Sequence, residues 1–229
     1  MIIDDKGTIN VSLRDQSIFA CLSMTAFLVF IGAYGCYTGE AVCNSEHFPM
    51  ISDFLKLPFY DRIFCLLSTF LCLSCMIGNI RAVYAMLYPV CDEAKDWSND
   101  VLFWLGVVGA FALPMVGFFD ETIHTIHGAS AVTFFITYTI YAFWLLSLMQ
   151  KYKDSLTQDQ QAIIPTLKMT TAAIIAAGVS FVTSYLIYGT AKPYFAYLEW
   201  TLTLLLINFF AFVSFDNDYY QSVHRFEEK

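Results

Sequence analysis

Charged residues are scarce in this chain. Only 14% of its 229 residues are Asp, Glu, Lys or Arg, whereas 58% are hydrophobic and 17% are aromatic. A soluble domain carries about a quarter charged residues, so the composition argues against a water-soluble protein. The few charges are mostly acidic, with a net charge of -8 and no basic patch, so we expect no nucleic-acid partner.

Several signatures of catalysis are also missing. The sequence contains no His-Glu-x-x-His segment, no Gly-x-Ser-x-Gly elbow and no Cys/His spacing typical of a zinc finger. It therefore gives no direct indication of a metalloprotease or a serine hydrolase. We expect neither a metal ion nor a cofactor.

Long apolar runs dominate what is present. Each run has about 18 to 22 residues, the length of one helical crossing of a bilayer. Only short connectors remain between them, so we predict one all-α integral-membrane domain, residues 1–229, that is a bundle of six transmembrane helices. The predicted crossings are Ser17–Tyr37, Ile63–Ile80, Val101–Phe119, Ala129–Met149, Met169–Tyr188 and Tyr194–Phe215. The longest connector on the outer side, Thr38–Arg62, is amphipathic, and Pro49 and Pro58 limit it to a short interfacial helix.

The distribution of basic residues predicts the orientation. Nine of the 12 Lys and Arg residues fall at the amino terminus, the second and fourth loops and the tail, which the positive-inside rule assigns to the cytosol. Both termini are therefore expected to be cytosolic. Five of these residues lie at crossing ends and could hold anionic headgroups or an acidic partner surface: Arg81, Lys95, Lys151, Lys153 and Lys168.

Two of the seven cysteines lie at or just beyond the outer end of the first crossing. The compartment expected there permits a disulfide between Cys36 and Cys43. Spacing alone does not establish the geometry of a bridge, so a disulfide and two free thiols both remain open.

Proline and small residues mark two of the crossings. Pro114 predicts a kink in the third crossing, which also contains Gly106 and Gly109. These residues favour close helix packing, or a lipid-binding groove between the third and fifth crossings. The fifth crossing has the small residues Ala172, Ala173, Ala176, Ala177, Gly178 and Ser180.

Acidic and imidazole groups gather near the outer surface. Glu199 lies about five residues into the sixth crossing, where a carboxyl group must be paired or protonated. Asp120, His124 and His127 are spaced i, i+4, i+7, so they share one face if their connector is helical. We expect Glu199 to contact this connector. A metal held by the imidazoles, with Glu199 as general base, is the less favoured alternative to a hydrogen-bonded loop.

Three segments at this membrane depth resemble the Frag/DRAM/Sfk family of six-crossing eukaryotic membrane proteins. They are Phe48-Pro49-Met50-Ile51-Ser52-Asp53, then Val116-Gly117-Phe118-Phe119-Asp120 leading to His127-Gly128 and Phe134-Phe135, and finally Leu198-Glu199-Trp200. The resemblance extends from about residue 17 to residue 216. The family includes a post-GPI-attachment lipid-remodelling factor of the Golgi, the damage-regulated autophagy modulators, and a regulator of phosphoinositides and lipid asymmetry at the plasma membrane.

Within that family, the Cys43-Asn44 pair before Pro49 and the Phe118-Phe119 run are most similar to the GPI lipid-remodelling branch. The resemblance implies a role in fatty-acid exchange on GPI anchors in the Golgi or endoplasmic reticulum, with the plasma membrane as an alternative location. We favour a non-enzymatic subunit that binds phospholipid or GPI lipid for a larger membrane partner, either a remodelling enzyme or a lipid-transfer protein. The alternative is an acyltransferase or hydrolase that uses Asp120, His124, His127 and Glu199.

Overall fold

Six membrane-length helices form a bundle in the computed structural model of the chain. The structure describes residues 2–3, 9–10, 12–44, 47–119, 123–189 and 193–213. A short antiparallel pair, β1 (Ile2–Ile3) and β2 (Ile9–Asn10), precedes the helices. The helical elements are α1 (Leu13–Thr38), α2 (Ile51–Leu55), α3 (Pro58–Leu71), the π-helix η1 (Cys72–Met76), α4 (Ile77–Glu93), α5 (Ser98–Phe118), α6 (His124–Lys151), the 3-10 helix η3 (Lys153–Ser155), α7 (Gln158–Tyr188), α8 (Pro193–Ile207) and α9 (Phe209–Val213).

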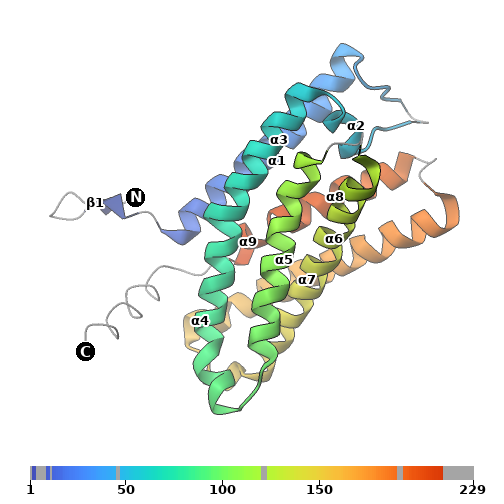
Figure 1. Cartoon of the computed structure of the whole chain (residues 1–229). Helices are drawn as coiled ribbons and strands as arrows, with labels where there is room; N and C mark the ends of the chain where they lie inside the picture. The colour runs from blue at the N-terminus through green and yellow to red at the C-terminus, as the bar shows by residue number, and fades with distance from the viewer. Residues whose placement is uncertain are drawn as a thin grey trace.

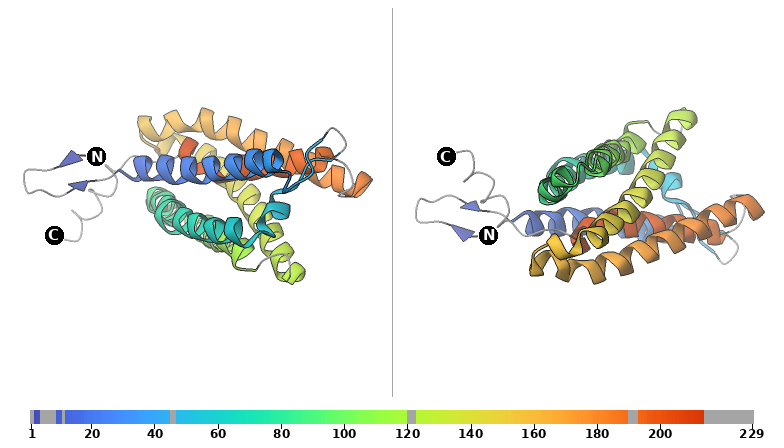
Figure 2. Two further views of the ribbon diagram at one scale, coloured as in Figure 1. Left: turned by 90° about the horizontal axis from the view of Figure 1, so that it is seen from above. Right: turned by 90° about the horizontal axis from the view of Figure 1, so that it is seen from below.

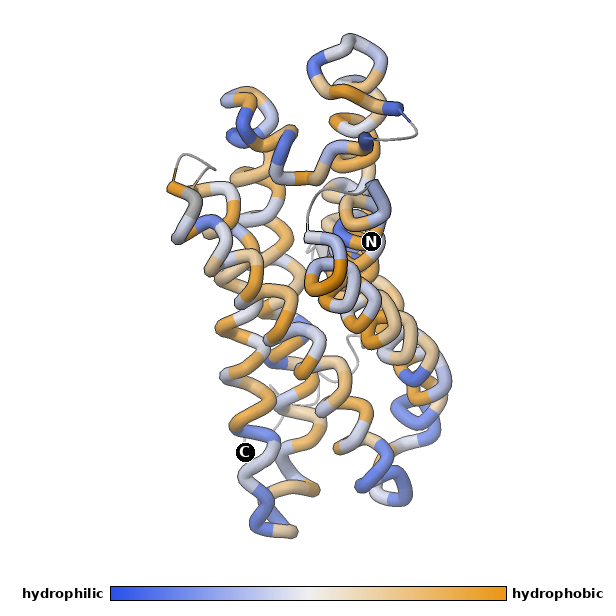
Figure 3. Tube along the Cα trace, turned by 90° about the vertical axis from the view of Figure 1, so that its right-hand side faces the viewer, coloured by the Kyte–Doolittle hydropathy of each residue, from blue (hydrophilic) through white to orange (hydrophobic). Residues whose placement is uncertain are grey.

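The predicted fold class is confirmed, because six helical segments are long and apolar enough to cross a membrane. Figure 3 shows hydrophobic residues along the middle of the bundle and hydrophilic residues toward its two ends. The expected short helix in the first outer connector is α2, which lies at the end of the bundle where α5 ends and α6 begins (Figure 1).

Two helices extend well beyond their predicted crossings. The second runs without interruption through α3, η1 and α4 for 36 residues, about 54 Å at 1.5 Å per residue, which exceeds a 30 Å hydrocarbon core. Arg81 therefore lies inside a helix rather than in the loop that the sequence predicts after Ile80. Lys168 likewise lies inside α7, which begins at Gln158 with a capping box between Thr157 and Gln160.

The helices pack around one continuous core of buried apolar residues. Helix α5 packs against α6, α3 and α4, while α7 packs against α8, α6 and α9. Figure 2 shows the same arrangement from above and from below, with α3, α4 and α5 on one side of α1 and with α7 on the other. The third and fifth crossings thus share α6 as a neighbour.

The glycines of the third crossing serve this packing. A Cβ added at Gly106 would meet the Tyr141 ring at 2.8 Å, and one added at Gly109 would meet Tyr138 and Thr137 still more closely. The absence of side chains at both positions lets α5 approach the aromatic face of α6. Helix α5 continues through the buried Pro114 as far as Phe118.

A buried polar cluster accompanies the π-helix. Asn79 donates from Nδ2 to Ser17 Oγ at 2.7 Å and to the Cys75 carbonyl at 2.9 Å, and Ser17 donates to the Leu13 carbonyl at 2.7 Å. Cys21 Sγ lies 3.1 Å from the Ile207 carbonyl, next to the break between α8 and α9. These contacts pair polar groups that would be costly to leave unpaired in a membrane, and they fix α1 against α4 and α8.

Asp96, in the turn between α4 and α5, ties together the end of the bundle at which these two helices meet. Its Oδ2 accepts hydrogen bonds from Lys151 Nζ at 2.6 Å and Tyr152 Oη at 2.7 Å, and its Oδ1 accepts one from the Ser98 N–H at 2.9 Å. The hydrogen bond from Lys151 is the main reason that the pKa of Asp96 is held well below its usual range. This carboxylate therefore links the turn to the end of α6.

We expect Asp96→Asn to lower the melting temperature at neutral pH and to reduce the acid sensitivity of the protein. Because the folded-state pKa of Asp96 is depressed, its stabilising contribution is complete above about pH 4 and is lost as the pH falls through the folded-state value. Thermal unfolding at about pH 6 and about pH 3 measures both effects. Asp92→Asn, at an exposed carboxylate of the same region, is the control. Equal behaviour of the two variants would contradict this role for Asp96.

Candidate functional site

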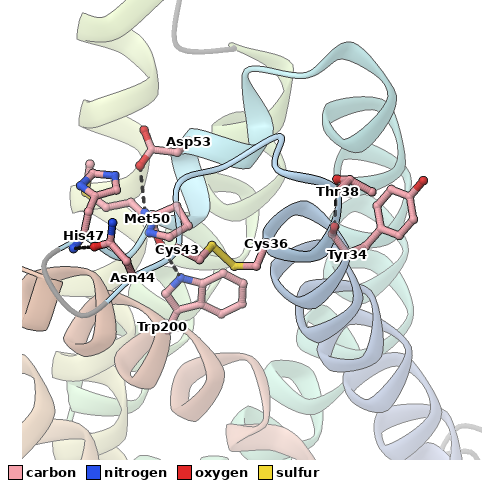
Figure 4. The surroundings of a disulfide bond; sticks show 10 residues. Tyr34, Cys36, Thr38, Cys43, Asn44, His47, Met50, Asp53 and Trp200 are labelled. Atoms are coloured by element: carbon pink, nitrogen blue, oxygen red, sulfur yellow. Dashed lines mark hydrogen bonds between the residues drawn. A yellow bond between two sulfur atoms is a disulfide. The ribbon is translucent and has the colours of Figure 1, made fainter.

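A covering segment, residues 47–55, closes the end of the bundle where α5 ends and α6 begins. It includes α2 and follows a disulfide that joins Cys36, in the last turn of α1, to Cys43, with a Cα–Cα separation of 5.4 Å (Figure 4). Of the two states left open by the sequence, the structure contains the disulfide. The bridge ties the start of this segment to the first crossing.

Helix α8 packs against the covering segment and holds it in place. The Trp200 indole donates from Nε1 to the Pro49 carbonyl at 3.1 Å (Figure 4), and the Phe48 ring stacks on Tyr197 with centroids 4.6 Å apart. Trp200 also meets Phe54 of α2 edge-on. A buried aromatic residue with its N–H paired contributes both apolar contact and orientation, so these contacts define where α2 lies.

Glu199 makes the adjacent polar contact. Its Oε2 accepts a hydrogen bond from the Ile51 N–H, the first residue of α2, at 3.3 Å. That N–H belongs to a helix amino terminus and has no partner within the helix. Among the described residues, the hydrogen-bond partner of Glu199 is Ile51. The expected contact of Glu199 with the connector of residues 120–127 therefore stays a prediction.

His127, near the start of α6, is buried with only 7% of its surface exposed. Its Nδ1 lies 2.9 Å from the Val116 carbonyl and 3.0 Å from the Phe119 carbonyl. Both partners are acceptors, so Nδ1 carries the hydrogen and donates it to carbonyls at the end of α5. In the neutral ring this leaves Nε2 as a hydrogen-bond acceptor.

Glu199 and His127 line the same small cavity beneath the covering segment. Its volume is about 40 Å³, and Ser52 and Thr203 add hydroxyl groups to an otherwise apolar wall that includes Phe135. The structure therefore brings together two of the four predicted polar residues. Asp120 lies outside the described residues, and so does the side chain of His124, whose backbone begins α6.

Metal binding receives no geometric support from the described parts of the chain, where no three His, Cys, Asp or Glu side chains form a group that could hold an ion.

The polar side chains of the small cavity can bind a hydroxyl group or a water molecule. At 40 Å³ it has room for one or a few water-sized groups.

A larger apolar groove lies between α6 and α7. It has a volume of about 440 Å³, within the range of ligand pockets, and it is open at the side of the bundle. Its walls include Phe135 and Ile140 of α6, Gly178 and Val179 of α7, and Leu202 of α8. Phe135 lines both this groove and the small cavity.

This location differs from that of the groove predicted between the third and fifth crossings, which stays a prediction. Gly178 contributes to the groove, but Pro114 and Ala177 are buried in the packed bundle. The other four predicted small residues of the fifth crossing, Ala172, Ala173, Ala176 and Ser180, are exposed on the surface of α7. Phe135 lines both the groove and the small cavity. It belongs to the Phe134-Phe135 motif, but the sequence did not identify it as a site residue.

The basic residues predicted at crossing ends lie in different places in the structure. Lys151 is paired with Asp96, whereas Arg81 is exposed along α4 and Lys153 is exposed in η3. A hollow of about 200 Å³ beside the turn between α4 and α5 is lined by Lys95, one of the predicted basic residues, together with three carboxylates, Asp92, Asp96 and Asp100. Binding of anionic headgroups by these lysines and Arg81 stays a prediction.

Six helices that are long and apolar enough to cross a bilayer define an integral membrane protein. The profile of the Frag1/DRAM/Sfk1/Cwh43P N-terminal domain matches residues 16–218. The chain therefore belongs to the Frag1/DRAM/Sfk1 family, as the sequence motifs predicted. Neither the curated proteins nor the solved structures yielded a match.

Proposed function

We propose that this protein is a membrane-embedded lipid-handling subunit that holds the acyl chain of a phospholipid or GPI lipid between α6 and α7. The observation that carries the proposal is the lateral apolar groove of about 440 Å³. Its position on membrane-crossing helices makes a lipid chain the available apolar occupant, and filling it with such a chain leaves no polar group unpaired.

The subunit would present this lipid to a larger membrane protein, either a GPI-remodelling enzyme or a docked lipid-transfer protein. The similarity of Cys43-Asn44 and Phe118-Phe119 to the GPI-remodelling branch supports the first partner, with the Golgi or endoplasmic reticulum as the compartment. Exposed apolar residues along α7, including Met169, Leu186 and Ile187, provide a surface that lipid or a partner helix can cover.

Filling the groove should remove the bound lipid. A Cβ at Gly178 meets no atom within 4 Å, so Gly178→Phe can place its ring in the groove without disturbing the core. We expect about a tenfold loss of lipid that co-purifies with the protein and is counted by native mass spectrometry, since the apolar contact area is then taken by the ring.

Ala176→Phe is the matched control. It adds the same ring to the same helix at an exposed position outside the groove. The proposal fails if both variants retain lipid equally, or if Gly178→Phe retains it while remaining folded.

We further propose that both termini are cytosolic. The excess of Lys and Arg at the corresponding loops supports this orientation, and the disulfide between Cys36 and Cys43 fits an oxidising compartment at the opposite end. In sealed microsomes, protease added outside should remove an amino-terminal tag. Protection of that tag would reverse the topology.

An acyltransferase or hydrolase is the second candidate, favoured by the shared cavity of His127 and Glu199. A general base next to a carboxyl group could activate a hydroxyl group or water for attack on an ester. Incubation of the purified protein with GPI lipid and an acyl donor tests this candidate directly. Ester exchange that depends on His127 and Glu199, with the fold intact, would replace the accessory function.

A further inference from the structure

The small cavity and the large groove are adjacent compartments that share the Phe135 side chain. Phe135 is half-buried, and it contacts Phe181 of α7, with ring centroids 5.8 Å apart. Phe181 in turn stacks on Phe195 of α8 at 4.6 Å. If the acyl chain of a lipid lies in the groove, its glycerol backbone can lie next to this aromatic wall. The polar cavity is then on the opposite side of Phe135.

The polar groups in the cavity define what part of a lipid can enter it. Because Nδ1 of His127 donates to two carbonyls, Nε2 of the neutral ring is an acceptor. Among the described residues, no group donates a hydrogen bond to this Nε2. The Glu199 carboxyl group accepts one hydrogen bond, from the Ile51 N–H. Thr203 and Ser52 supply hydroxyl groups to the same cavity. Such a set can hold a hydroxyl group as both donor and acceptor.

Charge and size oppose a phosphate in the same place. None of the described residues that line the cavity is Lys or Arg, so a phosphate would be desolvated beside the Glu199 carboxyl group without a counter-charge. The volume of about 40 Å³ also suits a hydroxymethyl group better than a phosphate with four oxygens.

We propose that the cavity of His127 and Glu199 is a hydroxyl-binding site for a neutral glycerolipid whose acyl chain lies in the groove between α6 and α7, with Phe135 as the partition. This inference rests on the proposed lipid-binding function and adds the class of headgroup. The site selects a free hydroxyl group next to an ester-linked chain and rejects the corresponding phosphate.

A competition between two lipids with identical chains tests this selectivity. The purified full chain is offered equal amounts of dioleoylglycerol and dioleoyl phosphatidic acid in phosphatidylcholine nanodiscs, and the bound lipids are measured by native mass spectrometry. We expect dioleoylglycerol to be enriched by about tenfold, because a buried phosphate without a counter-charge is costly. Equal binding, or enrichment of the phosphatidic acid, overturns the inference.

Two sets of variants identify the residues. His127→Asn with Glu199→Gln preserves a donor toward the α5 carbonyls and an acceptor toward Ile51, while removing the imidazole Nε2 and the acidic group. We expect the enrichment to disappear and the melting temperature to change little. Ser52→Arg places a guanidinium group at the cavity wall and should reverse the preference toward phosphatidic acid. Unchanged selectivity in both sets contradicts the assignment.

The groove variant separates the two levels of the proposal. If Gly178→Phe abolishes binding of both lipids but the unmodified protein does not discriminate between them, the groove is correct and the hydroxyl site is wrong. If Gly178→Phe changes the binding of neither lipid, the proposed function itself fails, and the hydroxyl site fails with it.

Discussion

Gly109→Leu is expected to destabilise the bundle by about 3 kcal/mol or more, at the upper end of the cost of overpacking a core. Gly109 lies where α5 crosses α6, and any side chain there would overlap the Tyr138 ring and Thr137. Tyr138 is itself fully buried among other aromatic residues, so its ring has no open space to enter. Thermal unfolding in detergent measures the effect.

Gly128→Leu provides the matched control for that substitution. Gly128 lies in the first turns of α6, and a Cβ there meets no atom within 4 Å. Leucine also has the higher helix propensity, so the control should show no loss of stability. Similar melting temperatures for the two variants would mean that close approach at Gly109 does not hold α5 against α6.

Trp200→Ala is expected to cost about 3 to 5 kcal/mol, the usual range for removing a buried large aromatic side chain. The indole fills the space between Gly32 of α1 and Phe54 of α2 and donates to the Pro49 carbonyl, so its loss releases the covering segment as well as opening a void. Protease sensitivity within residues 47–55 should rise together with the loss of thermal stability.

Two further variants separate packing from hydrogen bonding at this position. Trp200→Phe retains much of the ring and should lose only about 1 kcal/mol through the missing N–H. Trp104→Ala removes an indole that is 64% exposed on α5 and should leave the covering segment intact. If Trp200→Ala leaves the protease sensitivity of residues 47–55 unchanged, Trp200 does not hold that segment.

The sequence predicted the six crossings because a bilayer imposes a length and a composition on each of them. It did not predict how far the helices continue beyond the hydrocarbon layer, so Arg81 and Lys168 were placed in loops. Hydropathy marks where a segment leaves the apolar layer, whereas helix ends depend on capping groups such as Thr157 and on packing beyond the bilayer.

The site was predicted in part for a similar reason. The depth of Glu199 in its crossing showed that it needs a polar partner, but that partner is the Ile51 N–H, 148 residues away along the chain. Small residues in the fifth crossing indicated a face that could accommodate another group, yet they did not indicate which helix lies opposite. The spacing of Asp120, His124 and His127 predicted that they share one helical face. The Nδ1 of His127 instead contacts carbonyls at the end of α5, which only tertiary packing brings near.

The most direct test of the lipid-binding account is a cryo-electron microscopy map of the full chain in phosphatidylcholine nanodiscs supplemented with dioleoylglycerol, with a bound antibody fragment to aid alignment. The account predicts elongated density for an acyl chain between α6 and α7, along Ile140 and Val179, with its polar end at Phe135. A groove closed by its own side chains, or ordered lipid only on other faces of the bundle, would contradict it.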